Sequence, residues 1–159
     1  MDRHRFLSHP TKPFEISSSR TTDQLMAEMA STAFQGRRLG EAFEIWTRML
    51  KKRQIVIWMG IAGAMVPAGM RKIIAQFIRR RMVDVLVTTG ATVYHDAYEA
   101  IGGKHFKATD KVDDVQLRKC RVDRIYDVYA DEKRFYRLDI EIEKDFCSLL
   151  RDNYPYSSR

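Results

Sequence analysis

The sequence predicts an α/β fold: a Rossmann-like parallel sheet flanked by helices, with an N-terminal helical arm. Two short runs rich in β-branched residues, 55–59 (IVIWM) and 83–87 (VDVLV), are typical of strands buried on both faces. Between them lie a glycine-punctuated loop at 60–69 and an amphipathic helix at 70–81. The order strand, loop, helix, strand predicts a right-handed βαβ crossover between parallel strands.

The chain before this crossover predicts an extended arm and two helices. Residues 1–20 form the arm, because two prolines disfavour helix there and a run of serines follows them. Thr21, with Gln24 three residues later, fits a capping box that begins the first helix. We expect Gly36 to end this helix and a second helix to cover 39–51, with apolar residues along one face.

The chain after the crossover predicts three further helices and one strand. A helix is expected at 93–101, where two glycines follow it, and a short helix at 112–119, with Asp113 as its cap. Residues 125–130 (IYDVYA) predict a third strand, and 132–150 predict a long final helix.

Composition narrows the class of protein. The 159 residues are 45% hydrophobic, which suits a folded domain with a core of ordinary size. Glycines and a proline interrupt the most apolar stretch, so we expect no membrane span, and the charged start has no hydrophobic signal core. Cysteines without paired spacing are expected to be reduced thiols, which favours a cytoplasmic location. The net charge of +7 is scattered without an aromatic RNA-binding pattern, so we expect no nucleic-acid partner. The two cysteines lie 27 residues apart without metal-ligand spacing, and we expect no metal site.

Candidate ligand-binding residues follow both predicted parallel strands. Ligands of open parallel sheets bind beyond the carboxyl ends of the strands, where helix N-termini offer free N–H groups. Gly63 in the first turn allows close approach of the backbone, and Thr88, Thr89 and Gly90 in the second suit a ribose or pyrophosphate. The glycine spacing fits neither the dinucleotide fingerprint nor the phosphate loop, so a tight turn without a ligand remains an equal alternative.

Two polar residues are candidates for acid–base chemistry or for binding an amine. His95 is expected in the first turn of a helix at the strand ends, where it could act as a near-neutral base or remain structural. Asp127 interrupts an apolar run, which is costly unless the carboxylate is paired or faces a cation. A functional role and a structural salt bridge are both open for Asp127.

Three long segments resemble one enzyme family. They are IAGAMVPAGMRKII (61–74), MVDVLVTTGATVYHDAYEAIGG (82–103) and VDDVQLRKCRVDRIYDVYADE (112–132). They resemble the deoxyhypusine synthase family, especially its archaeal and bacterial branch, which includes the deoxyhypusine synthase-like proteins. On this resemblance, residues 21–159 are the N-terminal part of a single NAD-binding domain.

The resemblance implies an aminobutyltransferase that binds NAD and a polyamine. In this family NAD takes a hydride from spermidine, an imine forms, and the 4-aminobutyl group passes through an enzyme lysine to an acceptor amine. The acceptor is a lysine of a translation initiation factor in deoxyhypusine synthases and a small diamine in homospermidine synthases. The family's sites lie between subunits of a homotetramer.

The resemblance also carries roles to particular positions. His95 stands where eukaryotic members have a glutamate near the polyamine, and it becomes the candidate catalytic and substrate-binding residue. Asp127 stands where they have an asparagine, and it becomes a second substrate contact. The first turn lacks their serine and asparagine, so backbone N–H groups would have to bind NAD. The implied NAD contacts are Gly63, Ala64, Pro67, Thr89, Gly90 and Ala91.

The resemblance covers only the N-terminal half of the family. Its lysine nucleophile lies in a segment that corresponds to chain beyond Arg159, and no lysine here has the expected surroundings. We therefore expect an enzyme that is incomplete relative to the family, or that works with a complementary chain. The alternative is a non-catalytic subunit or paralogue that assembles with a catalytic chain.

Overall fold

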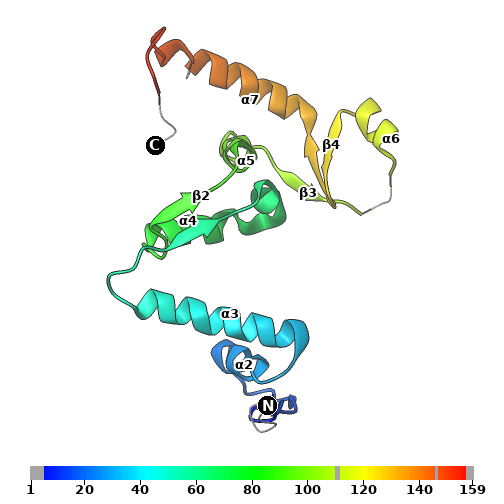
Figure 1. The fold of residues 1–159 in the computed structure, drawn as a ribbon. Coiled ribbons are helices and arrows are strands. Elements are labelled where there is room, and N and C mark those ends of the chain that lie inside the picture. The colour runs from blue at the N-terminus through cyan, green and yellow to red at the C-terminus, as the bar shows by residue number, and fades with distance from the viewer. Residues whose placement is uncertain (1–5, 110–111, 146, 157–159) are drawn as a thin grey trace. The chain divides into compact units, whose positions relative to one another are not determined.

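The computed structural model describes residues 6–109, 112–145 and 147–156, which fall into two units along the chain. The first unit is Met1–Ile57 and the second is Trp58–Arg159 (Figure 1). Among the described residues, no helix combines the length and the apolar character that crossing a membrane requires.

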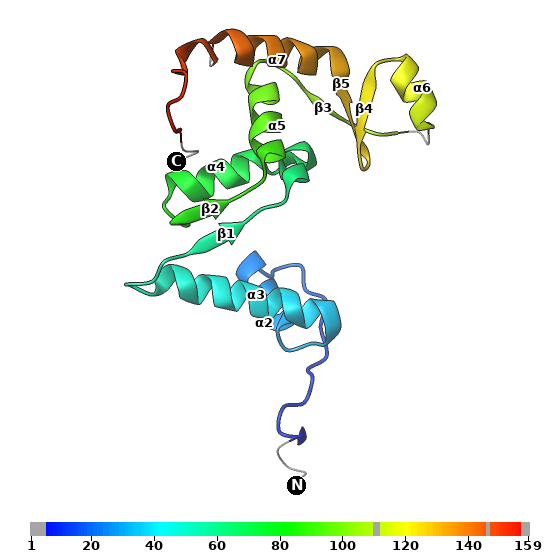
Figure 2. The same ribbon diagram turned by 45° about the horizontal axis from the view of Figure 1, so that its top comes forward.

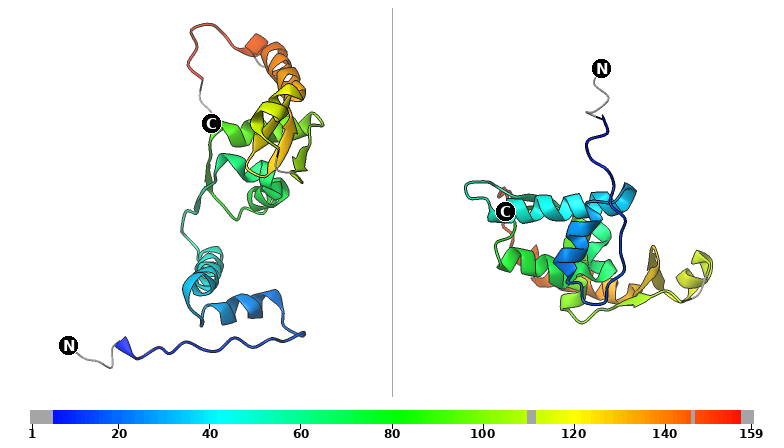
Figure 3. Two further views of the ribbon diagram at one scale, coloured as in Figure 1. Left: turned by 90° about the vertical axis from the view of Figure 1, so that its right-hand side faces the viewer. Right: turned by 90° about the horizontal axis from the view of Figure 1, so that it is seen from below.

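The first unit consists of an extended segment and two packed helices, α2 (Thr22–Met29) and α3 (Phe34–Lys51). The segment before α2 runs extended (Figure 3). Gln24 accepts a hydrogen bond from the Thr21 backbone N–H at 2.9 Å, as the capping box predicts.

The prediction that Gly36 ends the first helix is wrong, because Gly36 lies inside α3. The chain turns earlier, where the Thr32 hydroxyl donates to the carbonyl of Met29 at 2.7 Å. A hydroxyl that bonds to the backbone ends α2 here, in place of a glycine.

The second unit begins with the predicted parallel crossover. Strand β1 (Trp58–Gly60) pairs in parallel with β2 (Val85–Val87), with Met59 opposite Leu86. The connection between them contains the 3₁₀ turn η1 (Gly63–Met65), the π turn η2 (Val66–Met70) and helix α4 (Arg71–Arg79).

The strands of this crossover are not buried on both faces, contrary to the prediction. Trp58 is 66% exposed and Val87 is 52% exposed. Each strand has one neighbouring strand in the described part of the chain, so this sheet is two-stranded.

The predicted third strand is instead a hairpin in a separate antiparallel sheet. Strands β4 (Val122–Ile125) and β5 (Val128–Asp131) pair with each other, and β3 (His105–Lys107) pairs with the other edge of β5. Tyr126 takes a φ of 55° in the turn between β4 and β5. Asp127 therefore lies in a turn and does not interrupt a strand.

Helices flank this hairpin on both sides along the chain. The short helix α6 (Asp114–Lys119) begins as predicted, with the Asp113 carboxylate accepting the backbone N–H of Gln116 at 2.9 Å. The hairpin continues directly into α7 (Glu132–Asp145), as Figure 3 shows. The predicted final helix is shorter than expected, and a 3₁₀ turn, η3 (Cys147–Leu149), lies beyond it.

Helix α5 (Gly90–Ala100) joins the parallel crossover to the antiparallel sheet (Figure 2). Its Tyr98 is fully buried and forms the core with Ala130 and Leu138. The Tyr98 ring stacks on Phe135 with centroids 4.3 Å apart. Its hydroxyl donates to the carbonyl of Lys104 at 3.3 Å and accepts the backbone N–H of Asp131 at 3.2 Å.

The packing around Tyr98 predicts that Gly103→Ala destabilises the second unit. A Cβ at Gly103 would lie 2.5 Å from both the ring and the carbonyl oxygen of Tyr98, and a fully buried ring cannot move aside. We expect overpacking to lower the free energy of unfolding by about 1–3 kcal/mol, measured by denaturant unfolding. Gly60→Ala is the control, because a Cβ there meets nothing within 4 Å. An equal loss in both variants would contradict this account.

Candidate functional site

The turns that follow the two parallel strands lie against each other. A Cβ at Gly63 would be 2.9 Å from the Thr89 hydroxyl and 3.0 Å from the Cβ of Ala91. The hydroxyl of Thr92 donates to the carbonyl of Ala62 at 3.3 Å and links the start of α5 to the first turn. The structure thus brings together Gly63, Thr89 and Ala91, which the sequence places in separate segments.

This junction has features that suit a nucleotide. Thr89 is the N-cap of α5 but makes no side-chain cap hydrogen bond, so its side chain leaves the N–H groups of the first turn uncapped. The hydroxyl oxygen of Thr88 is buried and has no hydrogen-bond partner within the described residues. Uncapped N–H groups at a helix start bind phosphate, and a backbone without a Cβ allows close approach. The start of α5 and the Thr88 hydroxyl therefore fit a phosphate-bearing ligand.

The remaining predicted cofactor residues border the same turns. Gly90 is the first residue of α5, and a Cβ there would meet nothing within 4 Å. Ala64 lies in η1 and is half-buried. Pro67 is buried in η2, so we expect it to shape the turn and not to touch a ligand.

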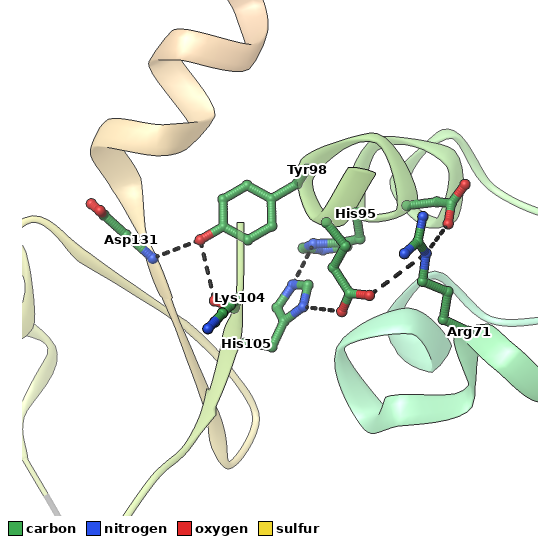
Figure 4. Close-up of polar contacts among 8 residues, drawn as sticks. Arg71, His95, Tyr98, Lys104, His105 and Asp131 are labelled. Carbon is green, nitrogen blue, oxygen red and sulfur yellow. Dashed lines mark hydrogen bonds and ion pairs between the residues drawn. The ribbon is translucent and has the colours of Figure 1, made fainter. Parts of the chain in front are cut away.

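His95 is the end of a hydrogen-bonded row of side chains (Figure 4). Nδ1 of His95 lies 3.2 Å from Nε2 of His105, and Nδ1 of His105 lies 2.8 Å from the carboxylate of Glu99. The Arg71 side chain bonds Asp96 and lies 3.6 Å from the other carboxylate oxygen of Glu99. The row therefore links the start of α4, through α5, to β3.

The His95 ring is partly buried, and its surroundings favour the neutral form. Its edge contacts Phe135, with ring centroids 5.7 Å apart. Burial lowers the pKa of His95 below its usual range, the neighbouring His105 adds to this effect, and Glu99 opposes it. His95 can therefore accept a proton at neutral pH.

A hollow of about 490 Å³ lies beside His95 and is lined by carboxylates and aromatic rings. Burial, and then the charge of Glu132, raise the pKa of Asp123 in this hollow. The Tyr94 hydroxyl donates to Asp139 at 2.6 Å. Its full lining is Tyr94, His95, Asp123, Arg124, Ile125, Glu132, Phe135, Tyr136 and Asp139. Carboxylates next to aromatic faces suit an organic cation.

The structure does not bring Asp127 into the hollow beside His95. Asp127 borders a second hollow of about 530 Å³, and Arg124 lines both. Asp123 takes the place beside His95, because it shares a strand face with Ile125 two residues later. The alternation of residues in VDRI (122–125) could have indicated from the sequence that Asp123 and Ile125 face the same side.

Two further residues of the row, His105 and Glu99, were not predicted from the sequence. Glu99 lies four residues after His95 on one helix, a spacing that puts both on the same face and could have been recognised. His105 lies in β3 with its side chain only 5% exposed.

The chain is similar in sequence to proteins of one family. A family model described as deoxyhypusine synthase matches residues 24–158. The chain is 59% identical over 111 residues to probable deoxyhypusine synthase 2 of Archaeoglobus fulgidus, covering 70% of this chain and 37% of that protein. It is 44% identical to probable deoxyhypusine synthase 1 of Methanosarcina mazei, and the match covers 92% of this chain and 46% of that protein. It is 38% identical to the deoxyhypusine synthase-like protein of Chlorobaculum tepidum, and the match covers 83% of this chain and 38% of that protein.

The chain therefore spans less than half the length of these curated relatives. The match of the family model nevertheless covers most of the chain, including both turns of the junction and the row that ends at His95. The chain belongs to the deoxyhypusine synthase family, in its archaeal-like branch.

Proposed function

We propose that the chain provides the NAD-binding part of an enzyme that transfers a 4-aminobutyl group from spermidine to an acceptor amine. The acceptor would be a lysine of a translation initiation factor. The observation that carries this proposal is the contact of Gly63 with Thr89 and Ala91, because it joins two strand-end turns into one binding surface. Family membership supports the reaction type.

The junction would hold NAD, which supplies the hydride acceptor when bound. The N–H groups of Gly90 and Ala91 at the start of α5 would bind its pyrophosphate, and the Thr88 hydroxyl would bond a polar group of the nucleotide. Gly63 allows the two turns to lie close together, and Ala64 lines the first turn. The first turn lacks the family's serine and asparagine, so its hydrogen bonds to NAD would come from backbone N–H groups.

The hollow beside His95 would hold the amine. Its carboxylates, Asp123, Glu132 and Asp139, attract a cation, and neutral His95 can take a proton from the amine nitrogen. Asp127 at the neighbouring hollow would be a further contact for the extended polycation. Loss of a proton leaves the nitrogen lone pair free, which hydride removal from the adjacent carbon requires.

A second function is favoured by an exposed aromatic side chain. Strand β1 leaves Trp58 66% exposed. A non-catalytic subunit that binds NAD and assembles with a catalytic chain would cover such a side chain. In either case we propose assembly with further chains, as a homotetramer or with a complementary subunit.

NAD binding is expected to weaken in Gly63→Ala. The added Cβ would press on Thr89 and Ala91, so the two turns must separate and the junction changes shape. We expect the dissociation constant for NAD, measured by calorimetry, to rise about tenfold or more, which is about 1.4 kcal/mol. Gly60→Ala is the control and should bind NAD as the unmodified chain does, because its Cβ meets nothing within 4 Å. Equal binding by Gly63→Ala and the unmodified chain would remove the junction from the proposal.

NADH formation is expected to require His95. In the assembled enzyme with NAD and spermidine, His95→Ala should slow NADH formation by about a hundredfold or more, because the proton acceptor is lost. His9→Ala is the control, since His9 is exposed and far along the chain from the site. Mass analysis of the products with candidate acceptors identifies the transferred group. Unchanged turnover in His95→Ala would remove it from the mechanism, and NAD binding without turnover in any mixture would favour the non-catalytic subunit.

A further inference from the structure

The row of Glu99, His105 and His95 determines where protons lie on both imidazole rings. At neutral pH a glutamate carboxylate only accepts hydrogen bonds. Because the Glu99 oxygen lies 2.8 Å from Nδ1 of His105, this nitrogen must carry the proton that is shared with Glu99. When His105 is uncharged, its Nε2 therefore carries a lone pair.

The second histidine follows from the first. Nδ1 of His95 lies 3.2 Å from the Nε2 lone pair of His105, so it must be the donor of that hydrogen bond. An uncharged His95 then has its proton on Nδ1 and a lone pair on Nε2. Free histidine in water prefers the opposite tautomer, so the row reverses an intrinsic preference in both rings.

The elements around the row keep this arrangement in place. The His105 side chain is only 5% exposed, and its ring centroid lies 5.2 Å from that of Tyr98. No hydrogen bond joins Nε2 of His95 to any residue that the structure describes. The titratable groups facing the two rings are Arg71 and Glu99 on one side and Tyr94, Asp123, Arg124, Glu132, Tyr136 and Asp139 around the hollow.

We propose that Glu99 and His105 are positioning residues that hold His95 in the Nδ1-protonated tautomer, with its Nε2 lone pair available to a ligand amine. The role in catalysis rests on the proposed function. In that step the N–H bond of a substrate ammonium breaks, the proton forms a bond to Nε2 of His95, and the electron pair stays on the amine. The positive charge on His95 is then stabilised through His105 by the carboxylate of Glu99.

Nitrogen-15 NMR of the histidine rings tests the tautomer directly in the 159-residue chain, without NAD or polyamine. At about pH 8, above the usual pKa range of histidine, we expect His95 to show a protonated Nδ1 and an unprotonated Nε2. In Glu99→Gln the side-chain amide can donate to Nδ1 of His105, so His105 loses its fixed tautomer. We expect the major population of His95 to shift to the Nε2-protonated form. Glu143→Gln, at an exposed position on α7, is the control and should leave the spectrum unchanged.

A second pair of variants covers the case in which Glu99→Gln fails to fold. His105→Gln offers a carbonyl to His95 and an amide to Glu99, and should preserve the tautomer of His95. His105→Phe offers neither group, so His95 should no longer be held in the Nδ1-protonated tautomer. An Nε2-protonated His95 in the unmodified chain, or an unchanged ring in folded Glu99→Gln and His105→Phe, would overturn the proposal. A chain that shows the expected tautomer but never forms NADH would contradict the proposed function alone.

Discussion

The burial of Tyr98 is the constraint on which the second unit depends. A tyrosine can be fully buried only if its hydroxyl finds partners, and Tyr98 bonds both the chain before β3 and the end of β5. Both bonds attach α5 to segments that are distant from each other in sequence. The stacked ring of Phe135 adds α7 to the same cluster. The position of α5 is therefore determined by packing and by hydrogen bonds at one residue.

A fixed α5 positions the whole candidate site, because its side chains serve three purposes. Tyr94 and Tyr98, four residues apart, face the aromatic core. His95 and Glu99, also four apart, share the next face and meet His105. The start of the helix meets the first glycine turn at Gly63. The proposed nucleotide and amine surfaces share this helix, so a shift of α5 would change both.

The parallel crossover could be predicted from the sequence, but the antiparallel sheet could not. Two β-branched runs around an amphipathic helix form a strong local pattern, and β1 and β2 pair as predicted. The hairpin turn at Tyr126 and Asp127 has no glycine or asparagine, the usual signals of a positive φ, so one strand was expected there. β3 is three residues long, too short for a pattern, and its pairing with β5 spans distant segments. The His95–His105 contact joins α5 to β3, so it could not be predicted while β3 was unrecognised.

Local charge outweighs net charge at the hollow beside His95. The chain carries +7, which on average repels a polyamine. At physiological salt, charges separated by more than about 8 Å are largely screened, so distant basic residues contribute little. Asp123, Glu132 and Asp139 line the hollow itself, where a bound cation would meet them without intervening salt. Burial, and then the charge of Glu132, raises the pKa of Asp123, and a cation beside it would favour its charged form. A basic protein can thus present an acidic site when its fold brings together carboxylates that are distant from one another in the sequence.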